Sequence, residues 1–261
     1  MLTTRFIQIA RRSQIPAVAL LVAGWLLLLL AGYVAGRLVT DAAPAWDARI
    51  GAAIHGTRGT PLTHAMQAIS ALGSPVVLDT VFISVITFLL VQRRVQDVRF
   101  LALASSGAVL LERLLKQLVD RPRPAGTHLV SAHGPSWPSG HASSTLALYG
   151  ALLILALADR RERGHESRRV LRALIAAGAA LVVLIGLSRI YLGVHNPSDV
   201  TAGWIISGTW LTMLTVITRH PQRWCRKGRL TGAEGPGTTS PGQRQRNAHL
   251  AAFPPIVPSH T

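Results

Sequence analysis

The chain has 261 residues, with 27 lysines and arginines against 11 aspartates and glutamates, which gives a net charge of +16. Hydrophobic residues make up 49% of the chain and charged residues only 15%, against roughly 25% charged in a typical soluble domain. This composition excludes intrinsic disorder for most of the chain, and the single cysteine excludes a disulfide scaffold. The basic excess is typical of nucleic-acid-binding proteins or of the cytoplasmic loops of membrane proteins.

Six apolar stretches have the length expected of membrane spans, which need about 20 residues of helix. They cover residues 15–35, 76–91, 100–118, 142–158, 170–187 and 200–217. We therefore expect an all-α integral membrane bundle of about six transmembrane helices. Between the first two spans, the segments AWDARIGAAIHG and LTHAMQAISALG have apolar residues at helical spacing, which predicts two short helices at the outer membrane interface.

The positions of the basic residues predict the orientation of these spans. Arginine clusters occur at 5–12, 93–99, 160–172 and 219–229, and with six spans all four lie on the same side of the membrane. The positive-inside rule makes that side cytoplasmic. We therefore expect a multi-pass protein of the cell inner (plasma) membrane with both termini cytoplasmic, and no nucleic-acid partner. The first span is longer than the apolar core of a signal peptide, so we expect a retained anchor.

The C-terminal part of the chain differs from the rest in composition. From Thr231 onward it consists mainly of Gly, Pro, Ser, Thr, Gln and Arg, without apolar periodicity. We expect residues 1–230 to form a membrane domain and residues 231–261 to form a disordered cytoplasmic tail. The sequence does not indicate an oligomeric state.

The outer segment between the third and fourth spans is rich in polar residues. In KQLVDRPRP, Lys116 lies near the end of the third span, and Arg123 follows between two prolines that end the helix and stiffen the chain. PSGH then places Ser139 and Gly140 at the start of the fourth span. Free N–H groups and the helix dipole make such a position favourable for an anion.

The other outer segment, SRIYLGVHNPSD, joins the fifth and sixth spans. Arg189 ends the fifth span, and His195 and Asp199 share one face of the sixth if its helix begins near Asn196. Three basic side chains, a helix N-terminus and the two histidines His141 and His195 together indicate a pocket for a multiply charged oxyanion, with a nucleophile and an acid beside it. Each feature alone has a simpler interpretation: an interfacial cation, a helix cap or a surface pair.

Several nearby residues have less specific roles. Glu112 lies one turn before Lys116 and can form an ion pair that orients it. Asp79 lies within the second span, where ionisable residues usually face the bundle interior. Trp137 can anchor the chain at the interface or line the site.

Other types of site are not supported by the sequence. It has no Walker loop and no Rossmann glycine pattern, and the histidines other than His141 and His195 lack the Cys or carboxylate partners of a metal site. We therefore expect neither a cofactor nor a metal. His128 and His133 lie in the outer loop, where solvated side chains are the favoured interpretation.

The polar segments resemble the type-2 phosphatidic acid phosphatase superfamily, the integral-membrane lipid phosphatases related to vanadium haloperoxidases. The family pattern is K-x6-R-P, P-S-G-H and S-R-x5-H-x3-D, and residues 116–124, 138–141 and 188–199 match it in that order. The region from the first to the last of these positions covers about a third of the chain. Because about ten specified positions agree, the joint pattern is far more specific than any single part.

The resemblance implies a metal-independent phosphohydrolase. His195 would be the nucleophile that forms a phosphohistidine, Asp199 would hold its imidazole, and His141 would protonate the leaving oxygen and then activate water. The other matched positions would bind the phosphoryl oxygens: Lys116, Arg123, Ser139, Gly140 and Arg189. A site at the outer ends of spans three to six admits a lipid whose tails stay in the bilayer. The expected substrates are phosphatidic acid, phosphatidylglycerol phosphate or undecaprenyl diphosphate.

Two other classes of protein could use such a pocket. A haloperoxidase would hold vanadate there, but the related haloperoxidases are soluble and six spans argue against this class. A lipid transporter or receptor would bind phosphate without needing the pair His195 and Asp199 opposite His141. The small size and the arginine-rich tail are typical of a bacterial protein, whose outer face would be periplasmic or extracellular.

Overall fold

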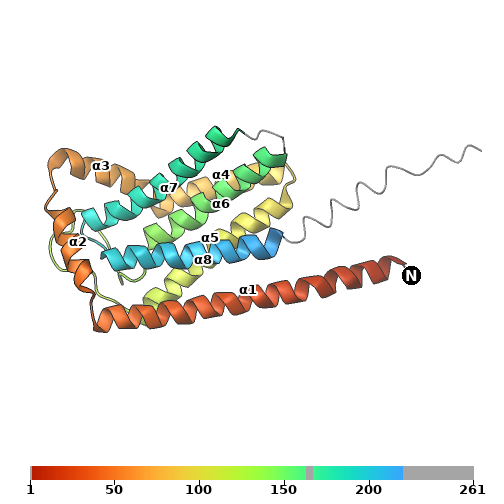
Figure 1. Cartoon of the computed structure of the whole chain (residues 1–261), viewed down its shortest axis with the longest axis horizontal. Coiled ribbons are helices and arrows are strands. Elements are labelled where there is room, and N and C mark those ends of the chain that lie inside the picture. The colour runs from red at the N-terminus through yellow and green to blue at the C-terminus, as the bar shows by residue number, and fades with distance from the viewer. Residues whose placement is uncertain (1, 163–166, 220–261) are drawn as a thin grey trace, which may run out of the picture. The chain divides into compact units, whose positions relative to one another are not determined.

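A computed structural model describes residues 2–162 and 167–219, and within them the chain forms helices and no strands (Figure 1). The helices are α1 (Leu2–Asp41), α2 (Ala45–His55), α3 (Thr60–Ala71), α4 (Pro75–Val91), α5 (Val95–Val119), α6 (Gly140–Glu162), α7 (Arg168–Tyr191) and α8 (Pro197–Arg219). The all-α prediction is confirmed. The predicted domain boundary at residue 230 and the predicted tail lie outside the described residues.

Most of the predicted spans correspond to long apolar helices. In the described part of the chain, five stretches are long and apolar enough to cross a membrane: Pro16–Asp41, Thr60–Val91, Gly140–Arg160, Arg168–Tyr191 and Pro197–Thr218. The second of these includes both α3 and α4. The chain is therefore a multi-pass membrane protein. The remaining predicted span, residues 100–118, lies in α5, which has 25 residues and contains five charged ones, at positions 97, 99, 112, 113 and 116.

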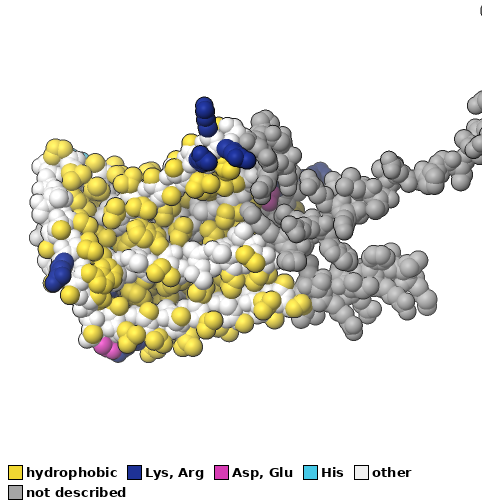
Figure 2. Space-filling model, in the orientation of Figure 1, with side chains coloured by type: hydrophobic (Ala, Val, Ile, Leu, Met, Phe, Trp, Pro, Cys, Tyr) yellow, Lys and Arg dark blue, Asp and Glu magenta, His cyan; other side chains and the backbone are white. Residues whose placement is uncertain are grey.

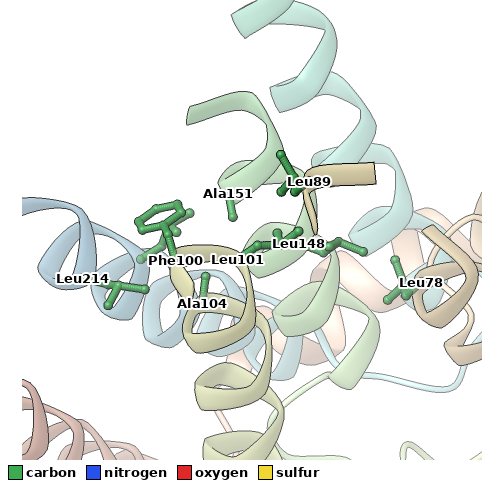
Figure 3. Packing of buried hydrophobic residues seen from close by; sticks show 9 residues of the cluster. Leu78, Leu89, Phe100, Leu101, Ala104, Leu148, Ala151 and Leu214 are labelled. Atoms are coloured by element: carbon green, nitrogen blue, oxygen red, sulfur yellow. The ribbon is translucent and has the colours of Figure 1, made fainter. Parts of the chain in front are cut away.

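Helix α5 packs against α1, α4 and α6, and this environment explains its composition. One face of α5 is buried, and its residues recur every three or four positions: Leu101, Ala104, Ala108, Leu111 and Leu115. Figure 3 shows part of this core, in which Leu101 and Ala104 meet side chains of α4, α6 and α8. Because much of α5 faces protein, it needs fewer apolar residues than a helix surrounded by lipid.

The two short helices predicted between the first two spans are present as α2 and α3, which lie at one end of the bundle (Figure 1). They are tied to the C-terminal end of α7. Arg58 donates two hydrogen bonds to the carbonyl oxygen of Tyr191, at 3.0 and 2.9 Å, and His55 Nε2 lies 3.0 Å from the carbonyl oxygen of Ile190. At this end, α5 and α7 finish and α6 and α8 begin.

The opposite end of the bundle contains the arginine-rich connections. Arg94, just before α5, forms ion pairs with Asp97 at 2.5 Å and with Asp159 of α6 at 3.0 Å. The start of α5 and the last turns of α6, which the arginine-rich segments adjoin, therefore lie at the same end, as the sequence predicts. Figure 2 shows hydrophobic side chains along the helices and the coloured basic side chains near the two ends.

Candidate active site

All the predicted site residues occur at the end of the bundle where α6 and α8 begin. Helix α6 starts at Gly140 and α8 starts at Pro197, both as the sequence predicts. The last turns of α5 and α7 contribute one cation each, Lys116 and Arg189. The first turns of α6 and α8 contribute His141 and Asp199, and the connecting segments contribute the rest: Arg123, Ser139 and His195.

His195 is buried beside the first turn of α8, and Asp199 faces one of its ring nitrogens. The distance from His195 Nδ1 to Asp199 Oδ2 is 3.6 Å, and the two side chains are 3% and 0% exposed. This distance is longer than a hydrogen bond, so the carboxylate faces the ring without bonding to it directly. The same carboxylate oxygen accepts a hydrogen bond from the backbone N–H of Asn196 at 2.8 Å, which closes the turn into α8.

The other ring nitrogen of His195 faces Arg123. The distance from Arg123 Nη1 to His195 Nε2 is 3.3 Å. Since a guanidinium only donates hydrogen bonds, Nε2 is the acceptor and the ring proton belongs on Nδ1, toward Asp199. The lone pair of Nε2 therefore points toward the cationic side of the site, where an anion would bind.

Arg123 is held in place by neutral groups. It donates hydrogen bonds to the backbone carbonyls of His133 (2.9 Å), Gly134 (3.0 Å) and Val194 (2.7 Å). Burial lowers the pKa of the Arg123 guanidinium, and the charge of Asp199 opposes this. An arginine stays charged under these conditions. Carbonyl partners thus orient Arg123 without neutralising it, so its charge is available to an anionic ligand.

The pKa of His195 is lowered to about 4, mainly because the ring is buried. The carboxylate of Asp199 acts in the opposite direction, and the positive charges of Lys116 and Arg123 lower the pKa further. His195 is therefore neutral at physiological pH. A neutral imidazole has the free lone pair that a nucleophile needs.

Lys116 is oriented by Glu112, as the sequence suggests. Its ammonium lies 3.5 Å from Glu112 Oε1 and donates a 2.7 Å hydrogen bond to the carbonyl of Pro135. A Cβ on Gly140 would lie 2.8 Å from Glu112 Oε1, so a side chain there would push the carboxylate away from its place beside Lys116. Gly140 therefore allows α6 to begin directly against the Glu112–Lys116 pair.

Ser139 and Arg189 present buried polar atoms at the same place. The N–H of Ser139 donates to the carbonyl of Asp199 at 3.0 Å, which joins the PSGH segment to α8. Arg189 Nη1 donates to Ser70 Oγ of α3 at 2.7 Å. Ser139 Oγ and Arg189 Nε are buried and have no hydrogen-bond partner among the described residues. These two atoms are therefore free to donate to an anion bound beside them.

His141 lies in the first turn of α6, with its ring against the turn that joins α3 and α4. A Cβ on Gly73 in that turn would lie 3.0 Å from His141 Cδ2, so the glycine makes room for the ring. His195 and the site's three cations are all near enough to act electrostatically on His141. The second histidine is therefore part of the same charged cluster.

Two site residues were not predicted from the sequence, Arg121 and Asp47. Arg121 Nη1 donates to Asp199 Oδ1 at 2.5 Å, and Arg121 Nη2 donates to Asp47 Oδ2 of α2 at 3.0 Å. Arg121 is one of two arginines in DRPRP, and its burial depends on contacts with distant segments. The signal that was available is the scarcity of carboxylates near the outer face, which makes each of them a candidate partner for an arginine.

The structure also gives the positions of three residues whose roles the sequence did not determine: Trp137, Asp79 and His128. Trp137 does not line the site: it is 4% exposed, and its indole N–H donates to the carbonyl of Gly32 in α1 at 3.2 Å. Asp79 is exposed rather than turned to the bundle interior. It lies in the first turns of α4, where the helix dipole favours a carboxylate. His128 is exposed in the loop, and its ring lies 2.9 Å from the carbonyl of Pro124.

Among the residues that the structure describes, the potential metal ligands do not cluster. Within residues 2–162 and 167–219, no group of three or more His, Cys, Asp or Glu side chains is placed to hold a metal ion. The polar groups that do converge are two histidines, a carboxylate and three cations. This set can bind a multiply charged anion and transfer protons.

Comparisons with known proteins agree with this chemistry. Residues 97–223 match the family model of the PAP2 superfamily. The chain is 28% identical over 170 residues to phosphatidylglycerophosphatase B of Bacillus subtilis, which covers 65% of this chain and 82% of that protein. It is 29% identical over 145 residues to an undecaprenyl-diphosphatase of Sulfolobus acidocaldarius, covering 53% and 63% of the two chains.

The fold also resembles a solved structure. The crystal structure of a transmembrane PAP2-type phosphatidylglycerolphosphate phosphatase from Bacillus subtilis superposes with a TM-score of 0.62 at 24% identity. The match covers 76% of this chain and 96% of that one. The likeness supports the arrangement of the helices.

Proposed function

The chain belongs to the PAP2 superfamily, and from this premise we propose that His195 removes the terminal phosphate of a membrane lipid through a phosphohistidine intermediate. The chain is an integral-membrane lipid phosphatase. The observation that carries the proposed residue roles is the position of the His195 ring, with Arg123 at Nε2 and Asp199 facing Nδ1.

In the first step, the Nε2 lone pair attacks phosphorus. The bond from phosphorus to the leaving oxygen breaks, its electron pair stays on that oxygen, and His141 supplies a proton to it. A bound phosphate offsets the positive charges around His141 and so favours its protonated form. The phosphorylated ring carries a positive charge with its proton on Nδ1, where the Asp199 carboxylate stabilises it.

In the second step, His141 takes a proton from water, and the water oxygen attacks phosphorus. The P–N bond breaks, its electron pair returns to Nε2 of His195, and phosphate is released. Lys116, Arg123 and Arg189 offset the charge on the phosphoryl oxygens in both steps, together with Ser139 and the N–H of Gly140. Each of these residues occupies a position of the family pattern that the sequence matches.

The proposed substrate class is a lipid with a terminal phosphate or diphosphate. The site lies at one end of apolar helices, so a head group can reach it while the lipid tails stay beside the bundle. The two curated relatives act, by their names, on phosphatidylglycerophosphate and on undecaprenyl diphosphate. We include phosphatidic acid on the same chemical grounds, since its terminal phosphate is also a monoester.

Phosphate release from purified protein in detergent tests this function. We expect release from at least one of phosphatidic acid, phosphatidylglycerol phosphate and undecaprenyl diphosphate, at a rate that excess EDTA does not change. Vanadate should inhibit, because it mimics the five-coordinate transition state. Loss of activity in EDTA with rescue by magnesium would contradict the mechanism, and no release from any lipid would contradict the function.

We propose further that the site faces the outside of the cell inner membrane and that both termini are cytoplasmic. Support comes from the arginine-rich segments, because the end of the bundle that contains Arg94 is opposite the end that contains His195. A reporter that works only outside the cytoplasm should be active when fused after Gly134 and silent when fused after Arg163. The reverse pattern would overturn this orientation.

A further inference from the structure

A buried polar network lies behind His195 and joins three segments that are distant in the sequence. It consists of Asp47 in α2, Arg121 in the loop after α5, and Ser198 with Asp199 in α8. These residues are 5%, 4%, 4% and 0% exposed, respectively. Charged groups this deeply buried are costly unless they are paired and hydrogen-bonded.

Every polar atom of Asp47 in this network has a partner. Asp47 Oδ1 accepts from the backbone N–H of Ser198 at 2.8 Å, and Oδ2 accepts from Ser198 Oγ at 2.5 Å and from Arg121 Nη2 at 3.0 Å. Arg121 Nη1 in turn donates to Ser198 Oγ at 2.7 Å and to Asp199 Oδ1 at 2.5 Å. The first turn of α8 is therefore clamped from the side of α2.

This clamp sets the orientation of the Asp199 carboxylate. Oδ1 is bound by Arg121, while Oδ2 accepts from the N–H of Asn196 and faces His195 Nδ1. Turning Oδ2 away from His195 would break the bond to Arg121. We propose that Arg121 and Asp47 are positioning residues for phosphoryl transfer, which hold Asp199 toward the nucleophilic histidine.

Asp47 has a second effect, which concerns charge. Arg121 alone would neutralise Asp199, and Asp199 could then do little for a phosphorylated His195 ring. With Asp47 on the other side of the guanidinium, two carboxylates share one cation and a net negative charge is left next to His195. That charge is what the positively charged phosphohistidine requires.

The inference rests on the proposed role of His195 and is tested by the variant Asp47→Asn. Asparagine has nearly the same shape and can still accept from the Ser198 N–H, but it lacks the charge. We expect the rate of phosphoenzyme formation to fall about 10- to 100-fold, as for other residues that orient a reactive group through a neighbour. Inhibition by inorganic phosphate should change little, because the three phosphate-binding cations are untouched.

Pre-steady-state bursts separate positioning from a purely structural role. A positioning role lowers the burst rate and leaves the burst amplitude per molecule of purified protein unchanged. A lower amplitude at an unchanged rate would mean that the network only holds the fold, which would overturn the proposal. Asp97→Asn is the matched control, because it removes a carboxylate from an arginine pair at the other end of α5. This control should keep both the rate and the amplitude.

Two more variants keep the test decisive if Asp47→Asn does not fold or if its effect does not act through Asp199. Ser198→Ala removes one hydroxyl from the network and should slow the burst in the same direction, by less, if Asp47→Asn does not fold. In an Asp199→Asn background, Asp47→Asn should add no further loss of rate, whereas independent, multiplicative losses would contradict action through Asp199. If wild type and Asp97→Asn form no phosphoenzyme on His195, the proposed function fails and this inference fails with it.

Discussion

Two arginines of one short loop, Arg121 and Arg123, have opposite electrostatic environments. Arg121 is buried between the carboxylates of Asp47 and Asp199. Arg123 is partly exposed and bonded to three backbone carbonyls, with its Nη1 next to His195. The first cation is neutralised by the protein, and the second is left positive. The comparison shows how one basic loop can provide both a structural support and a binding site for an anion.

The same contrast separates the other basic residues of the bundle. Arg94, at the end away from the site, pairs with Asp97 and Asp159, as expected of a structural link between helices. Arg189, at the site, has only the hydroxyl of Ser70 as a described side-chain partner. Two of the three site cations, Arg123 and Arg189, thus keep neutral partners, whereas Lys116 pairs with Glu112.

The largest expected effect comes from removing His195, whose ring lies between Arg123 and the Asp199 carboxylate that Arg121 binds. His195→Ala should lower phosphate release by about 10⁴-fold or more, because no other group supplies the nucleophile. His133→Ala, which alters an exposed histidine of the same outer surface, is the matched control and should stay near wild type. Substantial turnover by His195→Ala would place the nucleophile elsewhere.

Arg121, the arginine buried between two carboxylates, is expected to contribute to stability. Arg121→Gln leaves two buried carboxylates without their cation, so the free energy of unfolding should fall by about 3–5 kcal/mol. Asp97→Asn, in a more exposed pair, should cost about 1 kcal/mol or less. Unfolding in detergent measures both values. Similar small losses for the two variants would show that the buried network is not a special support.

Replacing Arg123, the arginine left positive, is expected to lower the rate with little loss of stability. Arg123→Gln removes a charge that faces the phosphoryl group, so kcat/KM should fall by about 10²–10³-fold, or about 2.7–4 kcal/mol of transition-state stabilisation. Its unfolding should resemble that of wild type, since its hydrogen-bond partners are backbone carbonyls and its loss leaves no buried carboxylate without a cation. A large destabilisation with normal turnover of the folded protein would reverse the assignment of the two arginines.

The smallest expected effect is on the pH dependence of kcat/KM. Since the pKa of His195 is lowered to about 4, the ring is neutral above that pH and becomes protonated, and inactive as a nucleophile, only below it. We expect an enzyme-dependent acid limb of kcat/KM near pH 4. Substrates whose phosphate groups have different second pKa values, which lie near 6, identify the limb that belongs to the substrate. An acid limb near 6.5 that does not move between substrates would contradict the low pKa of His195.

Local sequence signals predicted the site residues that lie at helix ends. Pro197 fits the first turn of a helix, so the start of α8 could be derived from the sequence. His195 lies just before that helix rather than on its face, but the spacing of four residues still predicted that it would face Asp199. The spacing of Glu112 and Lys116 predicted their pairing in the same way. These contacts span at most four residues, and helix geometry determines them.

The contacts that were missed depend on tertiary structure. Arg121 meets Asp47 and Asp199 across 74 and 78 residues of sequence, and Trp137 meets Gly32 across 105. No local pattern specifies which of two arginines in a proline-rich loop turns inward. Whether Trp137 lines the site or packs on α1 likewise depends on where α1 lies. The sequence therefore predicts the reactive residues better than the residues that support them.

The central claim, that His195 carries the phosphoryl group, is tested most directly by trapping the intermediate. His141→Ala should slow hydrolysis of the phosphoenzyme, so rapid quenching after mixing with a lipid that carries a radiolabelled terminal phosphate should capture acid-labile, base-stable label. Peptide mapping should locate that label on His195, and His195→Ala should remove it. Label on another residue, or a phosphoenzyme that forms normally in His195→Ala, would contradict the mechanism.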